Sequence, residues 1–243
     1  MSKLRDYSVL TFDCYGTLID WESGIWDALQ PLLVANGRDD LPRATMLERF
    51  AEIESAEQSE TPGRLYPELL ARVQARLAER LGLATSDALD RDFGASIAHW
   101  PAFPDTADAL RRLKRRYKLV ILSNVNRAGF AASNRKLGVA FDAIYTAEDV
   151  GAYKPDPRNF DFMLERLAAD HGIGRAQILH TAQSLFHDHV PATRAGLARC
   201  WIDRQGLAEG GDWGATAQVA ERPEVDFLFP TMAALADAVE AEQ

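Results

Sequence analysis

Six short apolar runs recur along this chain, separated by stretches with helical spacing, and this alternation constrains the fold more than any other feature. The runs are rich in β-branched and aromatic residues, which is typical of strands. They span residues 7–12, 118–122, 141–145, 177–180, 199–202 and 225–229. Because helical patterns separate the runs, a parallel sheet covered by helices is favoured over a sandwich. The sequence therefore predicts an α/β fold.

The stretch between the first two runs is different, because residues 21–99 show amphipathic helical patterns and no strand-like run. Ser23 is predicted to cap the first of these helices, and Gly82 to end the third. A helical block of roughly 75 residues is too long for a simple crossover between neighbouring strands. We therefore predict that residues 21–99 form a helical cap domain, and that residues 1–20 and 100–243 form the α/β core domain.

Charge and composition exclude several classes of protein. The net charge is −9 at pH 7, which disfavours nucleic acid and anionic membranes as partners but permits a small anionic substrate. No apolar run approaches the ~20 residues of a membrane span. Lys3, Arg5 and Asp6 precede the first apolar run, unlike a secretory signal, and two cysteines are too few for a disulfide framework. We expect a soluble cytoplasmic protein.

Polar side chains stand where the first four strand-like runs end. They are Asp13 after the first run, Ser123 and Asn124 after the second, Lys154 after the third, and Ser184 and Asp188 after the fourth. In an open α/β sheet, ligands bind outside the carboxyl ends of the strands. We therefore predict that these groups meet in one site.

The chemistry of this set centres on Asp13 and Lys154. A nearby cation lowers the pKa of a carboxylate and keeps it ionised, as a nucleophile must be. Each residue also has a structural interpretation: Asp13 and Asp188 as helix N-caps, and Lys154 as an exposed loop lysine. His187 either shuttles protons near neutral pH or points elsewhere. The ordered set of four strand ends favours the catalytic interpretation.

The segments VLTFDCYGTL, VILSN, GAYKPDP and SLFHD together carry a family resemblance. They resemble, in order, the four motifs of the haloacid dehalogenase superfamily, and the match extends from Val9 to Asp188. The resemblance implies a Rossmannoid parallel-sheet core with an all-helical cap inserted after the first strand. Most members are magnesium-dependent phosphatases with a second aspartate two residues after the nucleophile. Here that position is Tyr15, and Ser184 stands where phosphatases commonly place an acid.

These departures resemble the 2-haloacid dehalogenase branch, which uses no metal or other cofactor. The resemblance implies that Asp13 attacks a short 2-haloalkanoic acid, a small anionic substrate, and that water hydrolyses the resulting aspartyl ester. Asp188 either activates that water or orients Lys154. The residues implied to bind substrate are Tyr15, Thr17, Arg49, Ser123, Asn124 and Ser184, with Arg64 as the alternative to Arg49 in the cap. Family resemblance also favours a homodimer.

The residues themselves agree with this branch. Magnesium prefers carboxylate ligands, and the phenol of Tyr15 is a poor replacement. A halide leaves without a proton, so a missing general acid does not prevent dehalogenation. The alternatives are a magnesium-dependent phosphatase acting on a small phosphorylated metabolite and a non-catalytic binding protein on an enzyme scaffold. Phe160, where known dehalogenases place a tyrosine, leaves the exact substrate open.

Overall fold

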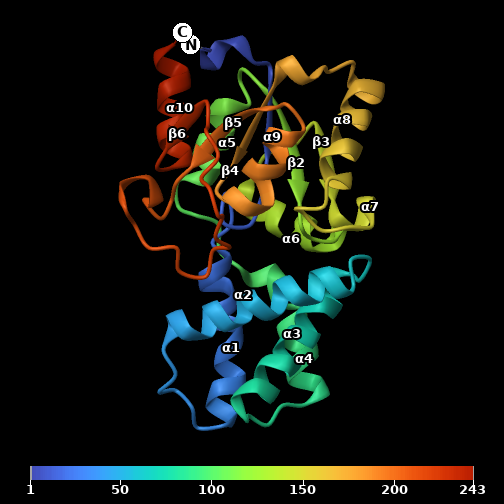
Figure 1. Ribbon diagram of the computed structural model, residues 1–243, viewed down its shortest axis with the longest axis vertical. Helices are drawn as coiled ribbons and strands as arrows, with labels where there is room; N and C mark the ends of the chain where they lie inside the picture. Colours follow the sequence, from blue (N-terminus) through green and yellow to red (C-terminus); the bar gives the residue numbers. More distant parts are fainter. Residues whose placement is uncertain (1, 243) are drawn as a thin grey trace.

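The computed structural model describes residues 2–242 and contains the predicted α/β core (Figure 1). The six strand-like runs form one parallel sheet in the order β3-β2-β1-β4-β5-β6. The strands are β1 (Val9–Phe12), β2 (Lys118–Ser123), β3 (Ala143–Thr146), β4 (Ile178–Ala182), β5 (Ala198–Ile202) and β6 (Phe227–Phe229). The central strands β1 and β4 are buried along their whole length, as expected for strands covered on both faces.

Helices cover both faces of this sheet and leave its carboxyl edge free for a site. One face packs against α5 (Thr106–Leu113), α6 (Arg127–Leu137) and α10 (Met232–Ala241), and the other against α8 (Arg158–His171) and α9 (Val190–Arg194). Successive side chains of a strand point to opposite faces. Accordingly, Leu10 and Phe12 belong to the first core and Val9 to the second. The short helix α7 (Ala147–Val150) follows β3.

The long insertion between β1 and β2 forms a block of helices beyond the carboxyl edge of the sheet (Figure 1). Its helices are α1 (Trp21–Ala35), α2 (Arg43–Glu60), α3 (Tyr66–Leu81) and α4 (Asp87–Gly94). The two segments that join this block to the core are bonded to each other. The Asp20 N–H donates to the Pro101 carbonyl (2.8 Å), and the Phe103 N–H donates to the Leu18 carbonyl (3.1 Å). The proposed domain boundaries, 20/21 and 99/100, lie beside these bonds.

The structure confirms the predicted helix end at Gly82 but not the predicted helix start at Ser23. Gly82 ends α3 in the left-handed conformation, which a residue without a side chain adopts readily. The predicted cap at Ser23 is wrong. Asp20 caps α1 instead, because its Oδ1 accepts a hydrogen bond from the backbone N–H of Ser23 (3.1 Å).

Two residues of the basic run that begins within α5 form ion pairs with acidic side chains of other segments. Arg112 contacts Asp237 (2.5 Å) and Glu240 (2.6 Å) of α10, and Lys114 contacts Asp142 (2.5 Å). This is the arrangement of a solvated, ion-paired helix face. Among the helices of residues 2–242, none is long and apolar enough to cross a membrane.

Candidate active site

Asp13 is the first residue after β1, and its side chain is held at the carboxyl edge of the sheet. It is buried, with only 5% of its surface exposed. Lys154 Nζ donates to Asp13 Oδ1 (2.9 Å), and Thr17 Oγ1 donates to Asp13 Oδ2 (2.9 Å). The Thr17 hydroxyl in turn accepts a hydrogen bond from the Gln183 N–H (2.9 Å), which directs its own proton toward Asp13. Donors from two separate segments therefore fix both carboxylate oxygens.

Lys154 joins Asp13 to Asp188. Its ammonium group is buried and donates to Asp13 Oδ1, to Asp188 Oδ1 (2.7 Å) and to the Leu122 carbonyl (2.9 Å). An ammonium group has three N–H donors, so these three bonds use all of them. Asn124 holds the backbone of Lys154: Asn124 Nδ2 donates to its carbonyl (3.0 Å), and its N–H donates to Asn124 Oδ1 (2.6 Å). The structure thus brings together the predicted groups from β1, β2 and β4 with Lys154.

Asp188 belongs to a buried polar chain that sequence reasoning missed. It lies in a π-helical turn, Leu185–His189, that begins three residues after the end of β4. His180 Nε2 contacts Asp188 Oδ1 (3.0 Å), and His180 Nδ1 contacts Thr11 Oγ1 (2.9 Å). A proton on Nε2 satisfies both contacts, with Nε2 donating to Asp188 and Nδ1 accepting from the Thr11 hydroxyl. The signal in the sequence was a histidine within a strand-like run.

Asp13 and Asp188 share the Lys154 ammonium group, and their pKa values shift in opposite directions. Burial raises the pKa of Asp13, and the Asp188 carboxylate acts in the same direction, against the opposing effect of Lys154. Burial also acts on Asp188, but Lys154 and His180 outweigh it and hold the pKa of Asp188 below its usual range. The prediction of a lowered pKa for Asp13 was wrong, because Lys154 is shared and the loss of solvent exceeds its effect.

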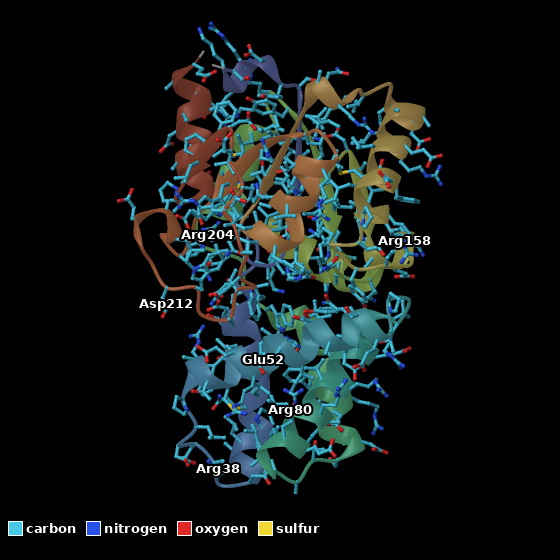
Figure 2. All side chains as sticks on the ribbon, in the orientation of Figure 1. Arg38, Glu52, Arg80, Arg158, Arg204 and Asp212 are labelled. Atoms are coloured by element: carbon cyan, nitrogen blue, oxygen red, sulfur yellow. The ribbon has the colours of Figure 1, made fainter. Side chains whose placement is uncertain are left out.

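A cavity of about 490 Å³ lies between the carboxyl edge of the sheet and the helical block. Figure 2 shows Glu52 of α2 at this boundary, and Asp212 on the long loop between β5 and β6. Residues 214–218 of that loop line the cavity as well. The core side of the lining includes Asp13, Tyr15, Asn124, Lys154, Ser184 and Asp188. The side formed by the helical block includes Trp21, Glu48, Glu52, Glu54, Ser55 and Tyr66.

Comparison with known proteins identifies the family of this chain. The family model for haloacid dehalogenase-like hydrolases matches residues 7–180, which is well over half of the chain. The chain belongs to this family. The curated relative (S)-2-haloacid dehalogenase H-109 of Pseudomonas putida is 31% identical over 213 residues. Those residues cover 85% of this chain and 90% of the relative.

Solved structures show the same fold as this haloacid dehalogenase-like hydrolase. One L-2-haloacid dehalogenase superposes with a TM-score of 0.78 at 24% identity, covering 97% of this chain and 99% of the other. The L-2-haloacid dehalogenase of Xanthobacter autotrophicus, solved with chloropropionic acid covalently bound, has a TM-score of 0.77 at 19% identity. This superposition covers 98% of this chain and 100% of the other chain. The fold is therefore that of the family, with its helical insertion included.

This hydrolase departs from the usual motifs of its family at Tyr15 and Phe160, and the structure shows what each side chain contacts. Tyr15 lines the cavity, and its hydroxyl contacts Ser133 Oγ (3.0 Å). Burial raises the pKa of Tyr15 well above its usual value, so a neutral phenol stands where phosphatases have an acid. Phe160 does not line the cavity, because its ring packs edge-on against His180 in the core, with centroids 5.0 Å apart. Within residues 2–242, no three His, Cys, Asp or Glu side chains gather as a ligand set for a metal ion.

The segments after β2 and β4 supply the remaining core-side candidates. Ser184 lines the cavity, and its hydroxyl contacts His187 Nδ1 (3.2 Å). Burial lowers the pKa of His187 to about 4, so the ring is neutral at pH 7. Ser123 is buried beside Asn124, and its hydroxyl has no hydrogen-bond partner within the part of the chain that the structure describes.

The structure does not bring a cap arginine into the cavity. Arg49 is exposed on α2, and Arg64 contacts Thr61 Oγ1 (3.3 Å); neither residue lines the cavity. The cavity-facing positions of α2 are 48, 51, 52, 54, 55 and 58, which form one arc of the helix, and position 49 falls outside it. Among residues 2–242, Lys154 is consequently the single lysine or arginine in the lining.

Proposed function

We propose that this hydrolase converts a short 2-haloalkanoic acid into the 2-hydroxy acid and halide, through an aspartyl ester on Asp13. Relatives named as 2-haloacid dehalogenases support the proposal. One observation carries it: the Lys154 ammonium lies between Asp13 and Asp188, with its three protons engaged. The charge of Lys154 lowers the pKa of Asp13 and so opposes the effect of burial, which favours the ionised carboxylate that a nucleophile needs.

In the first step, Asp13 attacks the α-carbon of the substrate from the face opposite the halogen. The new carbon–oxygen bond forms as the carbon–halogen bond breaks, and the halide leaves with the bonding electron pair. No proton is needed, so the neutral Tyr15 is compatible with this step. Lys154 and Thr17 hold the carboxylate in one orientation, which supports approach to the carbon within about 3–3.5 Å.

In the second step, water attacks the ester carbonyl carbon of Asp13. Negative charge develops on the carbonyl oxygen, and the Lys154 ammonium stabilises it. The ester bond then breaks, one proton of the water passes to the product oxygen and the other to solvent, and the Asp13 carboxylate is restored. The product is the 2-hydroxy acid.

Asp188 is proposed to orient both Lys154 and this water. Its Oδ1 accepts from Lys154 and His180, whereas its Oδ2 is buried without a hydrogen-bond partner among residues 2–242. A carboxylate with so low a pKa is a weak base, so its main effect on the water is orientation. Ser123 and Asn124 are proposed to donate hydrogen bonds to one end of the substrate.

A halide-release screen tests the function. Purified protein is assayed with chloroacetate, bromoacetate and both enantiomers of 2-chloropropionate, with Asp13→Asn as the inactive control. We expect halide release from at least one of these acids, unchanged after chelation with EDTA. Phosphate release from p-nitrophenyl phosphate that depends on added Mg²⁺, without halide release from any acid, would instead establish the phosphatase. Cytoplasmic location and the homodimer stay predictions.

A further inference from the structure

Among residues 2–242, the side of the cavity formed by the helical block has no lysine or arginine to receive an anionic substrate. Its charged lining residues within residues 2–242 are Glu48, Glu52 and Glu54. On the core side, Lys154 has no N–H left to donate, because its three protons are bonded to Asp13, Asp188 and the Leu122 carbonyl. A 2-haloacid has two electron-rich ends, its carboxylate and its halogen, and only one of them can face the core-side donors. The other end needs a donor from the helical block.

Glu54 differs from Glu48 and Glu52 because it accepts a hydrogen bond from a buried tyrosine. Tyr66 lies on the adjacent helix, is buried, and donates its hydroxyl proton to Glu54 Oε1 (2.5 Å). Within residues 2–242, Glu54 has no other hydrogen-bond partner and no ion pair. Tyr66 itself is fixed by the edge-to-face contact of its ring with Trp100, at a centroid distance of 6.3 Å. One oxygen of the carboxyl is thus anchored, and the other is available to the cavity.

This environment raises the pKa of the Glu54 carboxyl group. Burial raises its pKa to about 7, and the hydrogen bond from Tyr66 acts in the opposite direction. Among residues 2–242, no lysine or arginine forms an ion pair with the carboxyl group, and Lys154 across the cavity is already bonded to Asp13 and Asp188. The titratable and charged groups around it are Tyr66 and Tyr153 from the packed elements, Glu48 and Glu52 from its own helix, and Asp13, Tyr15, Lys154, His187 and Asp188 across the cavity.

We propose that Glu54 receives the anionic end of the substrate, its carboxylate or its departing halide, by donating a hydrogen bond from its protonated carboxyl group. This inference rests on the proposed dehalogenase function and specifies how the anion is bound. When it is protonated, a carboxyl group in a site shielded from bulk solvent donates a strong hydrogen bond. An anion beside it disfavours ionisation further. Binding of the anion therefore takes up a proton whenever Glu54 starts in its ionised form.

Proton uptake on binding is the direct test, and it needs no turnover. At pH 8, roughly one molecule in ten carries a protonated Glu54 in the free enzyme. Titration calorimetry with propionate, and separately with bromide, in two buffers of different ionisation enthalpy measures the protons taken up. We expect close to one proton for at least one of these probes, and the responding probe shows which end of the substrate Glu54 receives.

Two variants and a matched control isolate Glu54 from other titrating groups such as Asp13. Glu54→Gln keeps an N–H donor at every pH, so it should bind the same probe without proton uptake. Tyr66→Phe removes a bond that favours the ionised form, so the pH above which binding weakens should move upward. Glu79→Gln changes an exposed glutamate of α3 and should behave like the wild type. Melting curves confirm that each variant is folded.

Steady-state kinetics give the second readout. In the wild type, KM for the haloacid should rise about tenfold per pH unit above 7, whereas Glu54→Gln should show a nearly flat KM. Proton uptake that persists in Glu54→Gln, failure of both probes to bind, or preference for 2-chloropropionamide over the acid at every pH overturns the proposal. Uptake without halide release from any acid would leave Glu54 as an anion site and refute only the proposed reaction.

Discussion

Replacement of Lys154 by methionine removes the cation between two buried carboxylates while nearly keeping the volume of the side chain. The ammonium lies 2.9 Å from Asp13 Oδ1 and 2.7 Å from Asp188 Oδ1. A hydrogen bond to a charged group contributes about 1.5–3 kcal/mol. Loss of the Asp13 bond alone therefore lowers kcat/KM by roughly 10- to 150-fold. The loss of charge adds to this, because Asp13 then stays protonated to a higher pH.

We therefore expect Lys154→Met to lose at least ~10²-fold in kcat/KM at pH 7, about 2.7 kcal/mol. The acid limb of its pH profile should lie at higher pH than in the wild type. Two carboxylates without a counter-ion also cost about 3 kcal/mol of folding free energy, reduced by whatever protonation relieves. Bromide release from 2-bromopropionate between pH 5 and 9 measures the first two effects, and urea unfolding measures the third.

Two further variants make this experiment decisive. Lys118→Met alters an exposed lysine of β2 and should leave activity and stability near wild-type values. Lys154→Met combined with Asp188→Asn removes the surplus carboxylate, so stability should recover in part while activity stays low. A folded Lys154→Met protein with kcat/KM within about threefold of the wild type would show that Lys154 takes no part in the reaction.

Three other predictions follow from the same geometry. In a single turnover in ¹⁸O-water with enzyme in excess, mass spectrometry should find ¹⁸O in the Asp13 peptide; fully labelled product with an unlabelled peptide would mean direct attack by water. Because the attacking carboxylate must be ionised, kcat/KM should fall as the pH drops through the raised pKa of Asp13, above the usual 3.8; a profile flat down to pH 4 contradicts this. His180→Phe removes the donor to Asp188 and leaves the Thr11 hydroxyl unpaired, so unfolding free energy should drop by about 1–3 kcal/mol, with His180→Gln restoring part of it. An unchanged urea midpoint in His180→Phe would show that the two hydrogen bonds of His180 do not stabilise the fold.

The core of the site was predictable from the sequence because parallel strands share one carboxyl edge. Asp13 follows β1 and Asn124 follows β2, so the strand order alone brings them to the same place. Lys154 lies outside any strand, beyond α7, but the Asn124 side chain bonds its backbone on both sides. The order of these residues along the chain was therefore enough to expect a shared site.

The helical side of the site was not predictable in the same way. Whether residue 49 or residue 54 faces the cavity depends on the rotation of α2 about its own axis. That rotation is set by packing against α1 and α3, and spacing within a variable insertion does not reveal it. Arg49 was expected there, and the structure has Glu54 instead.

The sequence by itself determined the α/β fold, the inserted helices and the residues at the strand ends, because each depends on local periodicity and on chain order. Only the tertiary structure decided which carboxylate has the lower pKa, since Asp13 and Asp188 are both buried and compete for one ammonium group. The same holds for His180, whose role depends on the Thr11 and Asp188 side chains on either side of its ring. Burial and shared partners arise from contacts between distant segments, and no local pattern in the sequence records them.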